Sequence, residues 1–185
     1  MKHLKSIMYA DDDTESTPTL LRLRIPSLFL GLVLGFVVSF AVSRFEQVLS
    51  QDVRVVFFLP FIVYMAAAIG AQTQNIYSRD LKTGKARFHN YLIKESSLGC
   101  MFGVIFGVVT GLLVEWWLVD SLVAASIGLS MFGAALSAPI VALLTTEGLE
   151  RLGEDPAVYA GPIATVIQDT ISVIIYGVVC SQILL

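Results

Sequence analysis

The sequence predicts an all-α, polytopic membrane protein with five transmembrane helices. Hydrophobic residues make up 56% of the 185 positions and the mean hydropathy is +0.77. Charged residues make up only 15%, against roughly 25% in a typical soluble domain. The apolar residues gather in long blocks, each long enough to cross about 30 Å of hydrocarbon as a helix.

Five such blocks follow one another along the chain. They run approximately over Ile25–Ser43, Val55–Asn75, Ser96–Leu118, Ser121–Thr145 and Val158–Leu184. Blocks of this length without polar alternation are helices, because a helix satisfies its own backbone polar groups in lipid. We therefore expect residues 1–23 to form a short cytoplasmic N-terminal arm and residues 24–185 to form a five-helix membrane domain.

Lys and Arg predict the orientation of the five helices. Ten of the twelve basic residues lie before block one, between blocks two and three, or after block four. With five crossings, these three segments lie on one side of the membrane, and only Arg44 and Arg54 lie on the other side. The positive-inside rule then predicts a multi-pass protein of the cell inner (plasma) membrane, with a cytoplasmic N-terminus and an outer C-terminus. A net charge of −3 gives no indication of nucleic-acid binding.

A row of glycines runs through block three. Gly99, Gly103, Gly107 and Gly111 recur at four-residue spacing, which places them on one helix face. Such a row lets two helix backbones approach closely, either within one chain or between subunits. The alternative is ordinary membrane composition, and the length of the row favours packing.

The most informative polar residue is Asp169, which lies inside block five. A carboxylate near the bilayer centre costs roughly 2.5–3.5 kcal/mol on insertion scales, so it should face water, a cation or a polar partner. We interpret Asp169 as a cation ligand in a transport pathway. The alternative is a protonated or hydrogen-bonded carboxyl inside the bundle.

The residues around Asp169 favour the cation. Pro162 removes an amide donor and leaves a carbonyl free one turn earlier, and we count Gly161, just before it, among the candidate metal-binding residues through its backbone carbonyl. Thr165 adds a hydroxyl one turn before Asp169, and Gln168 and Ser172 are further neutral oxygens that are candidates to line a pore. One carboxylate with several neutral oxygens suits a hard cation such as Mg²⁺.

Several other polar residues are candidates with alternatives. Glu95 is either a cation ligand at the inner mouth or an interfacial charge beside Lys94. Asp155 either attracts ions at the cytoplasmic side or caps the helix that Pro156 begins. Three residues near the end of block two either line the pathway or bond the helix end: Gln72, Gln74 and Asn75.

One carboxylate per chain cannot enclose Mg²⁺, which keeps several of its waters. A symmetric homodimer would bring two Asp169 side chains to one axis, where they could hold a hydrated ion. Neither a catalytic set nor a nucleotide-binding motif emerges from the sequence, so we do not expect an enzyme.

Over about residues 24–180 the chain resembles the transmembrane domain of the MgtE family of magnesium transporters. The resemblance is carried by Arg24-Ile25-Pro26, by the stretch RFEQVL, by Gly70 and Gln72, and by Glu95 followed by Gly99. Its most specific part is the run from Asp155-Pro156-Ala157 through Gly161, Pro162, Thr165, Asp169 and Tyr176. This run is similar to the family pattern DPAxxSGPxxTxxxD with a later Tyr.

The resemblance implies a homodimer with a central pore lined by the second and fifth helices. It implies that Asp169 binds Mg²⁺ there, and that backbone carbonyls such as that of Thr165 assist. Typical family members carry a large cytoplasmic sensor with paired CBS modules before the membrane part. We expect no gating by such a sensor here unless another polypeptide supplies it.

The chain departs from the family pattern in the second helix. The usual GGNAGSQ reads AAAIGAQ here, from Ala66 to Gln72. We therefore keep other cargoes open, namely Co²⁺, Zn²⁺ or Na⁺. A further alternative is a non-conducting membrane partner of a soluble sensor or of a related transporter.

Overall fold

The computed structural model describes residues 15–152 and 156–185, which form seven helices joined by short connections. The helices are α1 (Thr17–Ser43), α2 (Glu46–Gln51), α3 (Val53–Val56), α4 (Leu59–Lys82), α5 (Phe88–Leu118), α6 (Ser121–Leu152) and α7 (Pro156–Leu184). Five stretches are long and apolar enough to cross a membrane, and each contains one of the five predicted blocks or most of it. The all-α prediction with five spans is therefore confirmed.

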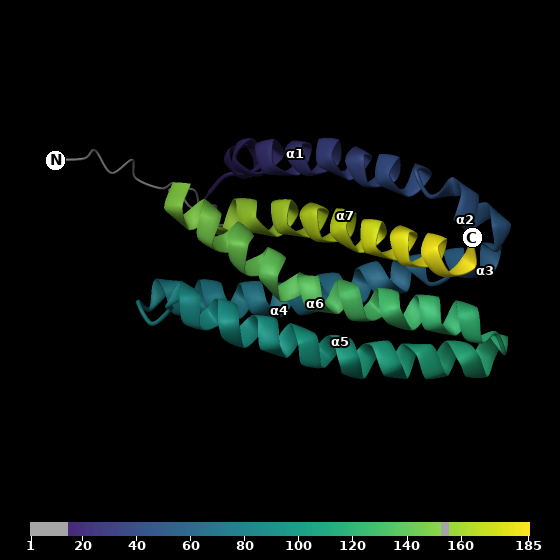
Figure 1. The fold of residues 1–185 in the computed structure, drawn as a ribbon. Coiled ribbons are helices and arrows are strands. Elements are labelled where there is room, and N and C mark those ends of the chain that lie inside the picture. Colours follow the sequence, from purple (N-terminus) through teal and green to yellow (C-terminus); the bar gives the residue numbers. More distant parts are fainter. Residues whose placement is uncertain (1–14, 153–155) are drawn as a thin grey trace.

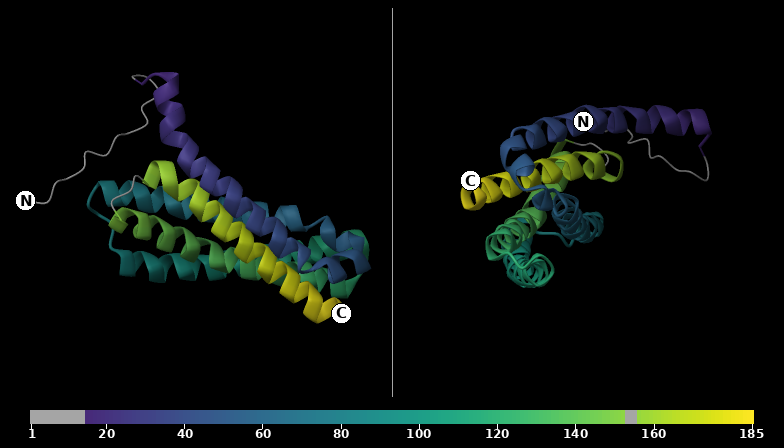
Figure 2. Two further views of the ribbon diagram at one scale, coloured as in Figure 1. Left: turned by 90° about the horizontal axis from the view of Figure 1, so that it is seen from above. Right: turned by 90° about the vertical axis from the view of Figure 1, so that its right-hand side faces the viewer.

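The long helices form a bundle in which α6 is central. It packs against α4, α5 and α7, and it is the most buried of the five spans. Helix α1 lies on the outer side of α7 (Figure 1), and its N-terminal part diverges from the other helices (Figure 2). The beginning of α1, the α4–α5 connection and the end of α6 lie at the same end of the bundle (Figure 1). We call this the basic end, where α4 ends at Lys82 and α5 begins at Phe88.

The helices continue past the apolar blocks at the basic end. Helix α4 continues to Lys82, and α5 begins at Phe88 rather than near Ser96. Residues that we expected in a loop, such as Lys94, are therefore helical. Helix α4 continues because no helix breaker lies between the apolar block and Gly84. Gly84 has a positive φ of 68° and lies in the turn that follows α4. Polar side chains do not end a helix that leaves the hydrocarbon.

Helix α1 also begins earlier than predicted. It starts at Thr17, with Pro18 in its first turn, and it runs through Pro26. The expected boundary between residues 23 and 24 therefore falls inside a helix. Pro is well accommodated in a first turn, where the missing N–H has no helical partner anyway.

Two short helices, α2 and α3, form the connection between α1 and α4 at the end opposite the basic end. The sequence analysis did not identify them, because a helix of one turn leaves no periodic pattern. Asp52 separates them, and its side-chain Oδ1 accepts the backbone N–H of Arg54 at 3.0 Å. This interaction caps the beginning of α3.

The glycine row of α5 packs against α6 within one chain. A Cβ added at Gly107 would lie 2.8 Å from the carbonyl oxygen of Gly128, and one added at Gly103 would lie 2.8 Å from that of Phe132. At Gly99 it would lie 2.7 Å from the ring of Pro139. The row thus serves a helix–helix contact in this chain, which was one of the two predicted uses.

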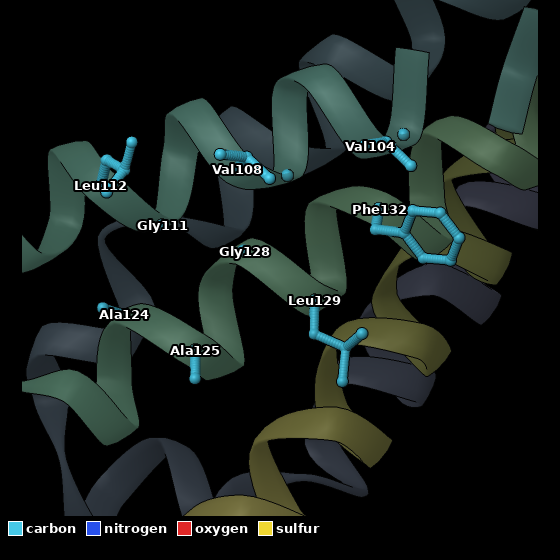
Figure 3. Close-up of a pocket in the computed structure, with 11 residues that line it drawn as sticks. Val104, Val108, Gly111, Leu112, Ala124, Ala125, Gly128, Leu129 and Phe132 are labelled. Carbon is cyan, nitrogen blue, oxygen red and sulfur yellow. The ribbon is translucent and has the colours of Figure 1, made fainter. Parts of the chain in front are cut away.

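A shallow apolar groove of about 470 Å³ follows the same seam. Val104, Val108 and Leu112 lie along its α5 side, and Leu129 and Phe132 along its α6 side (Figure 3). The glycines and alanines at the bottom of the groove keep the two helices close. Since the lining is apolar, the bilayer can cover the groove without desolvating a polar group.

Helix α7 is fixed to the opposite end of the bundle by two contacts. The Tyr176 hydroxyl is buried and donates a hydrogen bond to the carbonyl oxygen of Val55 in α3. At the next residue, Gly177, the ring of Phe45 packs directly on the backbone, and an added Cβ would lie 2.2 Å from the ring. The residues after α1 therefore hold α7 in a defined position relative to α3.

An ion-pair cluster joins the α2–α3 connection to the turn between α5 and α6. The Arg54 guanidinium donates to both Asp52 oxygens, at distances between 2.6 and 3.1 Å, and to Asp120 Oδ2 at 2.8 Å. The hydrogen bonds from Arg54 hold the pKa of Asp52 below its usual value near 3.8. The pKa of Asp120 is lowered too, mainly by the hydrogen bond from the backbone N–H of Val123 and next by the one from Arg54.

At the basic end, two hydrogen-bonded groups join α4 to its neighbours. The Tyr77 hydroxyl donates to Glu147 Oε2 in α6 at 2.6 Å, and Arg151 Nε donates to Glu147 Oε1 at 2.8 Å. Asp80 accepts from the Tyr91 hydroxyl of α5 and from Arg79 Nε at 2.9 Å. These contacts neutralise both carboxylates near the membrane surface.

Gly107→Ala tests the α5–α6 seam. The added methyl group would meet the Gly128 carbonyl, which belongs to backbone and cannot rotate away. Overpacking of this kind costs about 1–3 kcal/mol, so we expect a lower midpoint of thermal unfolding in detergent. Gly35→Ala in α1 is the matched control, because nothing lies within 4 Å of its added Cβ. Equal unfolding temperatures for the two variants would contradict the packing role.

Arg54→Gln tests the ion-pair cluster. Because the folded-state pKa values of Asp52 and Asp120 are lowered, their stabilisation is present above about pH 4 and is lost as the pH falls through the lowered values. We expect the variant to unfold about 2 °C below the wild type at pH 7, a small effect because the pairs are partly exposed. The difference should shrink as the pH falls below 4. A difference that is the same at pH 7 and pH 3 would argue against the ion pairs as its cause.

Candidate cation site

Asp169 lies midway along the 29-residue helix α7 and within the span Ile163–Leu184. Its side chain is half-buried, and its Oδ1 atom is buried without a hydrogen-bond partner in the described part of the chain. A buried carboxylate oxygen normally accepts at least one hydrogen bond, so this atom is an exception that asks for an explanation. The alternative that Asp169 is satisfied by a neighbour inside the bundle finds no support at Oδ1.

Thr165 lies one turn before Asp169 and is exposed on this chain. In a helix these two residues lie on nearly the same side, about 40° apart. The buried face of α7 is a different one, formed by residues such as Ala164, Gln168 and Ser172. Thr165 and Asp169 therefore lie at the edge of the packed face, with Thr165 exposed and Asp169 exposed in part, although its Oδ1 atom is covered.

Gln168 and Ser172 take part in the contact between α7 and α6. The Gln168 amide nitrogen donates to Ser172 Oγ at 3.1 Å and to Ser137 Oγ of α6 at 3.2 Å. It also lies 3.4 Å from the Ala134 carbonyl oxygen. Both side chains are buried in the single chain, and their pore-lining role stays a prediction.

A small hollow lies where α4, α6 and α7 meet, with a volume of about 30 Å³. Its polar lining comes from Gln74 of α4 and from Thr165 and Gln168 of α7. A space of this size with two or more polar partners can hold about one water molecule. Gln168 also has an Oε1 atom that is buried and has no partner among the described residues.

The altered segment of the second membrane helix contributes to this junction. Ala66 is fully buried, and Gly70 packs on α6 with its added Cβ 3.5 Å from the Ala138 carbonyl oxygen. Gln72 and Asn75 are exposed, whereas Gln74 is turned toward the hollow. Gln72 is therefore available to a second copy or to lipid, and its place in a pore stays a prediction.

Glu95 lies near the beginning of α5 at the basic end. Its Oε2 accepts the hydroxyl of Thr73 in α4 at 2.7 Å. Three basic residues, Lys85, Arg87 and Lys94, line the same pocket as Glu95. This setting favours the predicted alternative of an interfacial charge, because the neighbouring cations repel a metal ion.

Two predicted residues cannot be evaluated in the same way. Asp155 lies outside the described residues. Gly161 lies within α7, and the structure describes only its helical conformation. Their predicted roles, in ion attraction and in carbonyl coordination, stay predictions.

Within residues 15–152 and 156–185 no three His, Cys, Asp or Glu side chains come together to hold a metal ion. A dehydrated ion therefore finds no complete set of protein ligands among the described side chains of one chain.

The sequence analysis missed the residues that fix the frame of the site. Tyr77 and Glu147 join α4 to α6, and Arg54 joins two connections through Asp52 and Asp120. One signal was available for Arg54, since it is one of only two basic residues on the predicted outer side. Nothing comparable marks Tyr77, whose partner lies 70 positions away.

Comparison with known proteins agrees with this architecture. The family model for MgtE, described as a divalent cation transporter, matches residues 59–179, from α4 to most of α7. The chain is 28% identical to the magnesium transporter MgtE of Bacillus subtilis over 83% of its own length and 35% of that protein. It is 27% identical to that of Enterococcus faecalis (86% and 36%) and 26% identical to that of Thermus thermophilus (88% and 37%).

The chain thus spans about a third of the length of the curated relatives it matches. The matched region contains the α4–α6–α7 junction and Asp169, which are the elements of the candidate site. Five apolar spans and this match identify the chain as a multi-pass membrane protein that belongs to the MgtE family of divalent cation transporters.

Proposed function

We propose that this chain is the ion-conducting membrane part of a divalent-cation transporter, with Mg²⁺ as its cargo. In this proposal two copies form a homodimer and Asp169 of each copy faces a pore on their common axis. The observation that carries the proposal is the buried, unpartnered Oδ1 of Asp169 in the middle of a membrane span.

The free energy of desolvation explains why this atom needs a ligand. A charged carboxylate at membrane depth is unfavourable by roughly 2.5–3.5 kcal/mol unless water, a cation or a donor compensates. Among the described residues no donor reaches Oδ1. A hydrated cation supplies both charge and hydrogen-bond donors through its waters.

Mg²⁺ fits this arrangement better than a soft metal ion does. Mg²⁺ prefers oxygen ligands and gives up its waters reluctantly, so one or two carboxylates can hold it through those waters. Thr165, exposed one turn from Asp169, adds oxygen atoms on the same part of α7. Pro162 has no N–H to donate to the carbonyl of Val158, one turn earlier in α7, so this carbonyl is a further candidate oxygen ligand.

We propose that the basic end faces the cytoplasm and that the protein lies in the cell inner membrane. The beginning of α1, the α4–α5 connection and the end of α6 share this end, as the distribution of Lys and Arg requires. The membrane potential then drives cation entry, with roughly 2.3 kcal/mol per elementary charge per 100 mV.

Proteoliposomes that contain a Mg²⁺-sensitive dye and carry a negative interior potential test this proposal. We expect uptake by the wild type, and uptake by Asp169→Asn that is lower by about tenfold or more, because the amide keeps the size but loses the charge. Glu46→Gln, at the exposed beginning of α2, is the control that removes a carboxylate elsewhere.

Three results of this assay would each overturn a part of the proposal. Wild-type uptake by Asp169→Asn would remove Asp169 from the pathway. Absence of flux from the wild type would favour the non-conducting partner. A competition series in which Co²⁺, Zn²⁺ or Na⁺ is transported in preference to Mg²⁺ would reassign the cargo.

A further inference from the structure

A second, polar pocket lies at the basic end, away from Asp169. It has a volume of about 440 Å³ and is formed by the end of α4, the α4–α5 connection and the first turns of α5. Its lining consists of Ile76, Lys85, Arg87, Asn90, Tyr91, Lys94, Glu95 and Leu98.

The charge of this pocket is positive. Three cationic side chains face one carboxylate, which leaves two positive charges, and Glu95 already accepts the Thr73 hydroxyl. Lys85, Arg87 and Lys94 are exposed, and within the described ranges none of the three forms an ion pair. Asp80, which precedes the α4–α5 connection, is engaged by Arg79 and Tyr91.

The pocket is also apolar on one side. Ile76 and Leu98 remain 42% and 39% exposed, and they lie on turns of α4 and α5 that are farther from the basic end than the three cationic residues. A ligand that fits must therefore carry negative charge at one end and hydrocarbon at the other. The position at the helix ends is the depth at which phospholipid headgroups lie.

We propose that this pocket binds the headgroup of an anionic phospholipid. The phosphate lies among Lys85, Arg87 and Lys94, Asn90 donates its side-chain amide to the headgroup, and the acyl chains pass over Ile76 and Leu98. Free inorganic phosphate shares the charge but has no hydrocarbon to place against these two side chains. A divalent cation is disfavoured, because three positive side chains repel it.

Thermal unfolding of the delipidated protein in neutral detergent tests the proposal without reference to transport. The probes are phosphatidylglycerol, phosphatidylcholine with the same acyl chains, and inorganic phosphate. We expect phosphatidylglycerol to raise the unfolding temperature in a saturable way, and phosphatidylcholine and phosphate to have little effect. The triple variant K85Q/R87Q/K94Q should need about tenfold more phosphatidylglycerol, or more, for the half-maximal rise.

The control variant R22Q/R44Q/K82Q removes the same charge from exposed positions outside the pocket, and its response should stay within about twofold of the wild type. The single variant Arg87→Gln, which changes one side chain of the three, should show an intermediate response. Equal weakening by both triple variants would reduce the effect to net charge and overturn the site. An equal response to phosphatidylcholine, or to inorganic phosphate, would overturn the anionic lipid as the ligand.

Discussion

The structure depends on one constraint, which is that a carboxylate oxygen within a membrane span needs a compensating partner. Asp169 Oδ1 has none in the described part of its own chain. Two further side-chain oxygens in the described spans are also buried without a partner, Gln168 Oε1 and Glu115 Oε2, the latter near the end of α5. Other buried polar side chains form local hydrogen bonds. Ser126, Ser130 and Thr146 donate to the carbonyl four residues earlier, and Gln168 donates to oxygens of α6 and α7. Asp169 differs from both Gln168 and Glu115, because Gln168 bonds α6 and α7 through its amide nitrogen and Glu115 accepts the Ser121 hydroxyl through its other oxygen, whereas Asp169 lies midway along its span.

The rest of the fold holds α7 so that Asp169 remains at the edge of the packed surface. The glycine row removes side chains from the α5–α6 seam, so the backbones of these two helices pack closely. Helix α7 in turn packs against α6. Tyr176 fixes α7 to α3 at one end of the bundle, and the Tyr77–Glu147 hydrogen bond joins α4 to α6 at the basic end. The position of α7 in the bundle is thus set in part by the Tyr176 contact, which lies about two turns away from Asp169.

Much of this arrangement could be predicted from the sequence, because membrane spans are determined by length and hydropathy alone. The five spans and the depth of Asp169 in the last one follow from those properties. Length and hydropathy do not determine which neighbour each side chain of a helix meets. Gln168 and Asp169 are neighbours in sequence, yet one contacts α6 and the other lies at the edge of the packed face, and only packing decides between them. Long-range pairs such as Arg54 with Asp120, 66 positions apart, are equally hidden, since residue type does not identify a partner.

The central claim is that Asp169 of one copy lies near Asp169 of another across an aqueous axis. Asp169→Cys in a background with Cys100→Ala and Cys180→Ala, treated in membranes with a water-soluble bifunctional thiol reagent, tests it directly. Ile174→Cys in the same background is the comparison, because Ile174 is exposed on another face of α7. The account predicts efficient cross-linking into a dimer at position 169 and little at position 174. Cross-linking at position 169 that does not exceed that at position 174 would contradict it.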